Sequence, residues 1–265
     1  MILKDKVVMV AGIGPGLGFR TALNAAIEGA STVGISCRTP SYLDEAEAKI
    51  LEAAPNCKVV KAKADLASEP EGEAFAAKVF EAAGRIDALI NSGRYGGKSW
   101  SDPILETNFD DWTYAVEVNC MGMIKQARAV LPYLRKNGGG SIVMINTNSA
   151  KAKAPGNSGV SGYAMSKAAL TNATRNLAVA VGPDNIRVNS IYPSWMWNEP
   201  VIESIKADSS MGTLDEVYAM VAAGTALKRV MTDHEVSLAA LFLASDYSAA
   251  LTGAQLDTCG GEWMP

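Results

Sequence analysis

Apolar and polar positions follow two rhythms that alternate from one end of the chain to the other. Short apolar runs bounded by glycine or polar residues are typical of buried strands, and between them apolar residues recur every three or four positions, as in amphipathic helices. The runs predicted as strands cover residues 6–12, 31–37, 57–64, 86–92, 140–146, 186–193 and 254–261. The segments predicted as helices cover residues 17–29, 41–54, 68–84, 102–137, 162–177 and 234–245.

This alternation predicts an α/β fold with a doubly wound parallel sheet of the Rossmann type, about seven strands and helices on both faces. No linker, repeat or low-complexity tract divides the sequence, so residues 1–265 are expected to form a single domain. The least regular stretch, residues 194–228, is the candidate for a mobile, substrate-binding cap within that domain.

The bulk composition excludes several classes of protein. The chain has a net charge of −4 and only short basic runs, which argues against a nucleic-acid partner. No apolar stretch approaches the ~18 residues of a membrane span, and the N-terminal residues run directly into a predicted strand. We therefore expect a cytoplasmic protein with no membrane partner.

Cysteine and histidine are too sparse or too scattered for metal chemistry. Cys37, Cys57, Cys120 and Cys259 form no C-x-x-C motif, so they are interpreted as small buried residues. The single histidine, His234, cannot build a site of several histidines and is expected in the first turn of a helix. No metal site is predicted, and proton chemistry in this chain must use a group other than imidazole.

A glycine-rich turn joins the first predicted strand to the first predicted helix. Its sequence, "VAGIGPGLGF", lets the backbone turn sharply and lets a phosphate approach closely. The following helix offers free N–H groups and the positive end of its dipole to a pyrophosphate. Because position 17 is leucine, the common G-x-G-x-x-G spacing does not fit, but a related spacing does. The candidate cofactor-binding residues here are Gly12, Gly14, Gly16, Leu17 and Gly18.

Arg38 follows the second predicted strand, where the adenosine ribose of a dinucleotide would lie. An acidic residue there would accept hydrogen bonds from a ribose 2′-hydroxyl, whereas a guanidinium suits a 2′-phosphate. NADP(H) is therefore favoured, and NAD(H) stays possible. The alternative is a solvated arginine at the end of a strand.

Tyr163 and Lys167 stand four residues apart near the start of a predicted helix, so both side chains project from one face. A pair of this spacing also arises by chance on helix surfaces. What stands elsewhere in the chain must decide between these interpretations.

Seven short motifs along the chain supply that context. They are "AGIGPGLG", "ADL" (64–66), "LINSG" (89–93), "VN" (118–119), "YAMSK" (163–167), "IRVNSIYP" (186–193) and "TGAQLDTCGG" (252–261). In this order and spacing the chain resembles the short-chain dehydrogenase/reductase family over almost its whole length.

The resemblance implies a catalytic group. Tyr163 would be the general acid/base, and Lys167 would lower the pKa of its phenol and bind the nicotinamide ribose. Asn119 would support a water-linked proton relay.

The resemblance also implies cofactor contacts and assembly. Asp65 and Leu66 would hold the adenine, Asn91 and Gly93 would pass beside the cofactor, and the main chain from Pro193 to Met196 would meet the nicotinamide carboxamide. A homo-oligomer, tetramer or dimer, is expected, and the small residues after Tyr163 permit close helix packing.

The hydroxyl that positions the substrate oxygen in this family is where the sequence departs from the pattern. Counting forward from the strand at 140–146 selects Thr147, whereas counting back from Tyr163 falls beside Ser149. An insertion within residues 156–162 would explain the difference and favours Thr147. Ser149 would point the same way if the chain stayed extended.

Three further departures surround the predicted site. Arg94 stands where the family more often has glycine, which puts a charge near the cofactor or the rim of the pocket. Trp195 and Trp197 are candidates for an apolar wall over the substrate, or else for ordinary packing of the cap. Asn198 stands where a threonine often contacts the cofactor.

The leading functional hypothesis is an NADP(H)-dependent alcohol dehydrogenase or carbonyl reductase that interconverts a hydrophobic secondary alcohol and its ketone. The small-molecule alcohol or ketone is then the partner. The alternative is a catalytically inactive dinucleotide-sensing or scaffold protein, which would have no need of the tyrosine and lysine. Enoyl reductases also belong to this family, but they typically space tyrosine and lysine seven residues apart.

Overall fold

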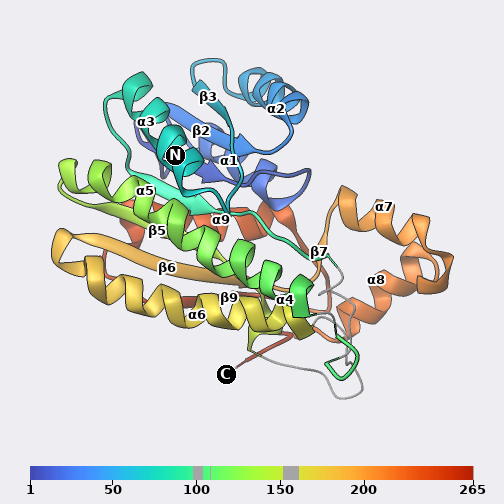
Figure 1. The fold of residues 1–265 in the computed structure, drawn as a ribbon. Coiled ribbons are helices and arrows are strands. Elements are labelled where there is room, and N and C mark those ends of the chain that lie inside the picture. Colours follow the sequence, from blue (N-terminus) through green and yellow to red (C-terminus); the bar gives the residue numbers. More distant parts are fainter. Residues whose placement is uncertain (98–103, 108, 152–160, 265) are drawn as a thin grey trace.

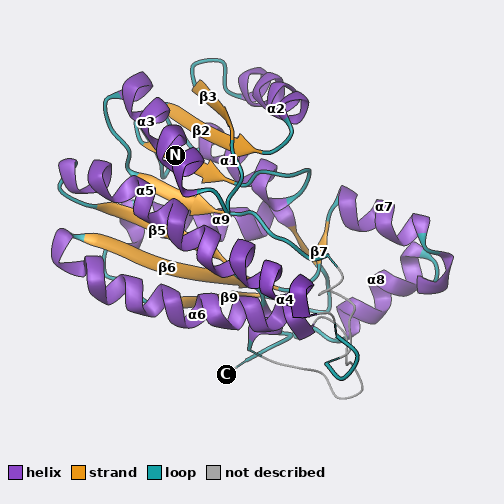
Figure 2. Ribbon diagram, in the orientation of Figure 1, coloured by secondary structure: helices purple, strands orange, loops and turns teal. Residues whose placement is uncertain are grey.

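A seven-stranded parallel sheet organises the described residues of the computed structural model, which are 1–97, 104–107, 109–151 and 161–264 (Figures 1 and 2). The strand order is β3-β2-β1-β4-β5-β6-β9. The strands are β1 (Val7–Ala11), β2 (Thr32–Cys37), β3 (Lys58–Lys63), β4 (Ala88–Asn91), β5 (Gly140–Ile145), β6 (Ile186–Pro193) and β9 (Gln255–Thr258). This confirms the doubly wound sheet in a single domain that the sequence predicts.

Helices cover both faces of the sheet because each strand buries side chains on alternate sides. Val8 and Val10 pack with α1, α2 and α9, whereas Val7 and Met9 pack on the opposite face with α3, α5 and α6. The bounds of these helices are α1 (Leu17–Ile27), α2 (Pro40–Ala53), α3 (Glu69–Ala83), α5 (Met123–Lys136), α6 (Ser161–Val181) and α9 (Asp233–Ala244). The predicted strands and most predicted helices are therefore confirmed to within a few residues.

The long helix predicted over residues 102–137 is wrong in two respects. Residues 104–107 form a turn, α4 (Phe109–Val116) begins after them, and residues 102, 103 and 108 lie outside the described residues. A π-helical segment, Glu117–Gly122, then separates α4 from α5. A π-helical turn shifts the apolar pattern by one position, and the sequence alone does not distinguish such a shift from an ordinary irregularity in a helix.

The segment 194–228 is more regular than the sequence predicts. It contains the short strand β7 (Met196–Trp197) and two helices, α7 (Glu199–Ala207) and α8 (Leu214–Ala223). Asn198 caps α7, and Thr213 forms a capping box with Glu216 at the start of α8. Figure 1 shows these two helices projecting from the carboxyl end of the sheet. The role of residues 194–228 as a substrate-binding cap stays a prediction.

The order in which the chain adds strands to the sheet reverses between β1 and β4. From β1 the chain builds outward to β2 and β3, and from β4 it builds the other way to β5, β6 and β9. In such sheets ligands bind in the crevice at the carboxyl ends of the strands, beside this switch point. The predicted cofactor loop and the β4 loop both lie there.

Two minor predictions, on the cysteines and on His234, are confirmed. All four cysteines are buried with free thiols, and His234 lies in the first turn of α9, where its Nδ1 is 3.0 Å from Asn24 Nδ2. Among the described residues, no helix combines the length and apolarity needed to cross a bilayer.

Candidate active site

The glycine turn between β1 and α1 is shaped for close approach. Gly12 has a φ of +79°, and a Cβ there would lie 2.6 Å from Gly93 Cα, so the two loops touch main chain to main chain. Gly18 is equally constrained, because its Cβ would lie 2.9 Å from Ile13 Cα. A Cβ on Gly14, by contrast, would meet nothing within 4 Å. Gly14 therefore leaves room beside the turn.

The start of α1 suits an anion. The helix begins at Leu17 after Gly16, with no side-chain cap and no acidic residue in its first turn. Such a terminus offers N–H groups and a positive dipole end. A Cβ on Gly16 would lie 3.3 Å from Asn198 Nδ2, so the residue that caps α7 also borders this turn.

The residues predicted to meet the adenosine end follow β2 and β3, at the same edge of the sheet as the glycine turn. Arg38 directly follows β2 and is exposed. Asp65 Oδ1 accepts a hydrogen bond from the Ala67 N–H at 2.9 Å. Leu66 is buried against Gly93, where a Cβ would come within 1.9 Å of Leu66 Cδ1.

Two polar atoms at the end of β4 have no hydrogen-bond partner among the described residues. They are Asn91 Oδ1 and Ser92 Oγ, and both are buried. The other end of the Asn91 amide is occupied, because Nδ2 donates to Met123 O at 3.1 Å. A buried polar atom without a hydrogen-bond partner destabilises the folded state. Together with the glycine turn, they fit a polar ligand such as a dinucleotide.

Tyr163 and Lys167 lie in the first turns of α6, and both are almost fully buried. Lys167 Nζ donates to Ile145 O at the end of β5, at 2.9 Å. Burial, followed by the charge of Arg94, lowers the pKa of Lys167 to about 7. The ammonium group therefore exchanges its proton near neutral pH.

The phenol of Tyr163 differs from the sequence-based expectation. Burial raises its pKa above the ordinary value, while the Arg94 guanidinium and a hydrogen bond with Thr147 act in the opposite direction. We expected Lys167 to be the cation that lowers this pKa. In the described structure desolvation is the largest effect on this phenol, and the role of Lys167 that the family resemblance implies stays a prediction.

The structure brings Thr147, and not Ser149, to the tyrosine. Thr147 continues the extended chain beyond β5, is buried, and shares a hydrogen bond with Tyr163. The chain then turns into a 3₁₀ segment, Asn148–Ala150. Ser149 N–H donates to Thr147 Oγ1 at 3.3 Å, so the extended backbone needed for Ser149 to point the same way is absent. The proposed insertion at 156–162 lies largely outside the described residues.

Asn119 sits fully buried in the π-helical segment and joins two neighbouring segments. Its Oδ1 accepts from the Tyr95 N–H at 2.7 Å, and its Nδ2 donates to Tyr95 O at 2.8 Å and to Ser166 Oγ at 3.0 Å. The side chain thus clamps the β4 loop to α6. Sequence reasoning missed both residues: Tyr95 lies outside the quoted motifs, and Ser166 lies within "YAMSK" but was assigned no role.

The segment after β6 provides the remaining predicted contacts. Pro193 ends β6 and is buried, and Met196 pairs with Met231 in the short sheet of β7 and β8 (Met231–Thr232). Trp197 packs edge-on against Tyr218 of α8, with ring centroids 4.9 Å apart. Trp195 keeps 40% of its surface exposed. Trp197 therefore packs within the cap, whereas Trp195 is the more accessible ring.

An ion pair that the sequence does not reveal anchors the turn after β5. Lys151 Nζ lies 2.6 Å from Asp257 Oδ1 of β9, with side chains only 14% and 19% exposed. The same ammonium sits 3.9 Å from the centre of the Tyr192 ring. Lys151 thus fixes the far end of the turn that begins at Thr147.

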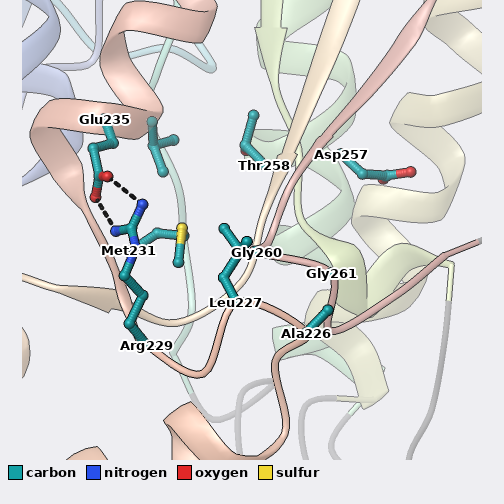
Figure 3. Close-up of a pocket in the computed structure, with 10 residues that line it drawn as sticks. Ala226, Leu227, Arg229, Met231, Glu235, Asp257, Thr258, Gly260 and Gly261 are labelled. Carbon is teal, nitrogen blue, oxygen red and sulfur yellow. Dashed lines mark hydrogen bonds and ion pairs between the residues drawn. The ribbon is translucent and has the colours of Figure 1, made fainter.

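A cavity of about 460 Å³ is lined in part by Asp257 (Figure 3). Arg229 and Glu235 form an ion pair at its wall, 2.7 Å apart. None of the residues predicted for the site lines it. The lining residues are Ala226, Leu227, Arg229, Met231, Glu235, Val236, Asp257, Thr258, Gly260 and Gly261.

The fold defines a class, a doubly wound parallel sheet with a glycine-rich turn at the switch point where such sheets bind ligands. Comparison with known proteins makes this specific. The family model described as enoyl-(acyl carrier protein) reductase matches residues 12–262. The chain belongs to the short-chain dehydrogenase/reductase family of NAD(P)-dependent oxidoreductases.

Individual relatives cover nearly the whole chain. Oxidoreductase UcpA of Salmonella typhimurium is 32% identical over 99% of this chain and 96% of its own length. Levodione reductase of Leifsonia aquatica is 32% identical, covering 97% and 94%. L-sorbose reductase from Gluconobacter frateurii, solved in complex with NADPH and L-sorbose, superposes with a TM-score of 0.90 at 26% identity, covering 99% of this chain and 98% of that one.

Proposed function

We propose that the protein interconverts a secondary alcohol and its ketone with NADP(H), and that Tyr163 is the general acid/base. The observation that carries this proposal is the buried phenol of Tyr163, which shares a hydrogen bond with Thr147 one helical turn before Lys167. A surface accident would leave these side chains in solvent. The names of the levodione and L-sorbose reductases support a carbonyl compound as the substrate.

The residues at the crevice fit the cofactor. The glycine turn and the start of α1 would hold the pyrophosphate, Arg38 the 2′-phosphate, and the main chain from Pro193 to Met196 the carboxamide. When bound, the nicotinamide supplies or accepts the hydride. L-sorbose reductase, the relative solved with NADPH, supports the phosphorylated form over NAD(H).

The chain's own residues would manage the proton. Burial keeps the Tyr163 phenol protonated at neutral pH, which is the form that donates to a ketone oxygen. Thr147 would hold that oxygen in line with the phenol through its hydroxyl. Lys167, whose pKa is about 7, would exchange a proton with its surroundings and so help to restore the phenol proton that Tyr163 has donated. Trp195 would contact an apolar part of the substrate.

A second reaction is supported by the description of the matching family model, which names enoyl reductases. In that reaction the substrate is an unsaturated thioester and the product is saturated. The spacing of Tyr163 and Lys167 supports the alcohol/ketone reaction instead. One assay separates the two reactions.

The test mixes the pure protein with NADPH or NADH and follows the loss of cofactor absorbance with two substrate panels. One panel contains apolar and polyhydroxylated ketones, and the other contains 2-enoyl thioesters. We expect turnover with ketones and a preference for NADPH. Turnover with thioesters alone would overturn the ketone assignment, and tight cofactor binding without turnover on either panel would favour the inactive dinucleotide sensor.

A further inference from the structure

The turn after β5, residues 146–151, carries Thr147 and is tied to neighbouring elements at both ends. At the near end, the Thr147 N–H donates to Asn146 Oδ1 at 2.9 Å. The amide nitrogen of Asn146 donates in turn to Lys167 O at 3.2 Å and to Thr171 Oγ1 at 3.1 Å. Both acceptors belong to α6, and Asn146 is buried, so its amide attaches the start of the turn to that helix.

The far end of the turn is held by β9 and β6. Lys151 Nζ lies 2.6 Å from Asp257 Oδ1 of β9 and 3.9 Å from the centre of the Tyr192 ring of β6. Tyr192 is fully buried, and its OH donates to Thr171 Oγ1 at 2.9 Å. This is the same hydroxyl that accepts from Asn146. The two ends of the turn are therefore joined in a closed loop of contacts through Tyr192 and Thr171.

The turn between these two ends is short and bonded within itself. The Ala150 N–H donates to Thr147 O at 3.1 Å, and the Lys151 N–H donates to Asn148 O at 2.9 Å. The Ser149 N–H donates to Thr147 Oγ1 at 3.3 Å, which occupies an acceptor site of that hydroxyl and leaves its proton to be donated. A shift of the turn at Lys151 would therefore reach the Thr147 hydroxyl within four residues.

The pair of Lys151 and Asp257 is better suited to hold a position than an ion pair on the surface. Its side chains are only 14% and 19% exposed, so water and salt screen their attraction weakly. In the pair of Lys49 and Glu45 on α2, both side chains are more than half exposed. The Tyr192 ring adds a second contact to the ammonium group of Lys151, and two contacts restrict a flexible side chain more than one does.

We propose that Lys151 and Asp257 are positioning residues for the Thr147 hydroxyl and that they act on it from β9 through the turn. This inference rests on the proposed function for its catalytic meaning, in which Thr147 holds the substrate oxygen in line with Tyr163. A tilted turn would misplace that hydroxyl. The effect should appear in kcat, because the orientation of the reacting groups is lost, and not in the affinity for NADPH.

The first test needs neither substrate nor cofactor. Amide hydrogen exchange of the Ala150 N–H, followed by NMR, measures how often the turn opens. In Lys151→Met and in Asp257→Asn, this exchange should become about tenfold faster, because one anchor of the turn is lost. Native exchange at Ala150 in both variants would overturn the inference.

A control variant separates the turn from the stability of the whole fold. Glu235→Gln removes the ion pair with Arg229 at the start of α9, outside the turn. It should speed up exchange at amides in the centre of the sheet, such as Val143, and leave Ala150 at the native rate. Equally faster exchange at Ala150 in Glu235→Gln and in Lys151→Met would show that the turn responds only to global stability, which contradicts the proposal.

The second test asks whether Lys151 acts through Thr147. In Lys151→Met, kcat for ketone reduction should fall about 10–100-fold, the scale on which a displaced reacting group slows a reaction. In a Thr147→Val background the same substitution should lower kcat little further, since the hydroxyl that Lys151 positions is already absent. Equal losses of kcat with and without the Thr147 hydroxyl would refute the positioning role.

Two further variants separate charge from shape. Lys151→Arg keeps a cation that can lie over the Tyr192 ring and pair with Asp257, so it should retain most of the native kcat. Asp257→Asn should reproduce the loss seen in Lys151→Met, and it serves both tests if Lys151→Met does not fold. A native protein without ketone turnover would sink the proposed function, while the exchange measurement would still decide whether the pair fixes the turn.

Discussion

Arg38 and Lys167 show how differently two cations behave in one site. Lys167 is 1% exposed, and loss of hydration lowers its pKa to about 7. Arg38 stands in solvent at the end of β2, where its charge is fully available. Lys167 therefore suits proton exchange, whereas Arg38 suits a stable ion pair with a phosphate.

The role of Arg38 leads to a prediction about cofactor choice. Replacing Arg38 with glutamine should weaken NADPH binding about 10–100-fold, since a charge-assisted contact to the 2′-phosphate is lost. Binding of NADH should stay unchanged, because it lacks that phosphate. Titration calorimetry with both cofactors measures this difference. An equal loss for NADPH and NADH would show that Arg38 has no part in selecting the cofactor.

A second prediction separates the two candidate hydroxyls. Thr147→Val keeps the shape of the side chain and removes its hydroxyl, so kcat should fall about 10²–10³-fold, as when one oriented donor is removed. Ser149→Ala is the matched control and should leave kcat close to the native value, since Ser149 lies in the 3₁₀ turn. Steady-state kinetics on both variants measures this. The reverse order of effects would restore Ser149 as the candidate.

At this scale, what the sequence could predict depended on whether the interaction was local. Tyr163 and Lys167 were found because four residues along a helix place two side chains on one face. The direction of the pKa shift of Tyr163 could not be predicted from the sequence, because burial depends on how α6 packs against its neighbours. The choice between Thr147 and Ser149 depended on a turn that begins one residue later.

Among the elements, the turn after β5 depends on an ion pair between distant parts of the chain. Lys151 comes from this turn and Asp257 from β9, the edge strand next to β6. The pair lies mostly out of solvent, so removing one partner leaves a poorly hydrated charge.

Lys151→Met should lower the free energy of unfolding by about 1–2 kcal/mol, since Asp257 is left without its partner in a partly buried place. Lys49→Met provides the matched control, because Lys49 pairs with Glu45 on the exposed face of α2, where both side chains are more than half exposed. In Lys49→Met the free energy of unfolding should fall by only about 0.3–0.5 kcal/mol. Urea unfolding measures both, and equal losses would show that the Lys151 pair contributes no more than a surface contact.

An ion pair at the start of α9 makes the free energy of unfolding depend on pH. Arg229, followed by the Thr232 N–H, holds the pKa of Glu235 at about 2, below the ordinary value of 4.5. A carboxylate whose folded pKa is depressed stabilises the fold above the ordinary pKa and loses that contribution as the pH falls toward the folded value. This contribution is therefore lost between about 4.5 and about 2.

Glu235→Gln should lower the free energy of unfolding at neutral pH by about 1 kcal/mol, a modest figure because the side chain is 37% exposed. The difference from the native protein should shrink as the pH falls below 4.5. Urea unfolding at a series of pH values measures this. A difference that stays constant with pH would mean that the ionised form of Glu235 does not stabilise the helix start.

The elements themselves were predictable where the apolar rhythm was strong, as in the strands of the sheet. The cap helices α7 and α8 were not predicted, because their short apolar faces are interrupted and their starts depend on caps at Asn198 and Thr213. The π-helical segment was not predicted, because a one-position shift of the apolar pattern does not by itself identify a π-helical turn. Its consequence is local but important, since it carries Asn119.

Across the whole molecule, the order of the strands gathers the site. Residues from the glycine turn, the end of β4 and the end of β5 are far apart in sequence, yet the strand order brings them to the carboxyl ends of neighbouring strands beside the switch point. The alternation of strands and helices predicted this sheet. The assignment of the glycine turn as the cofactor loop stays a prediction. A homo-oligomer stays a prediction, and exposed apolar side chains such as Met165 and Val179 on α6 are available to an interface.

The most direct measurement is the rate of ketone reduction by Tyr163→Phe, which removes one hydroxyl from a buried ring. We predict that kcat falls by about 10³-fold, the usual contribution of a positioned acid/base, while the affinity for NADPH stays at the native value. A variant that reduces the ketone at the native rate would contradict the assignment of the proton to Tyr163.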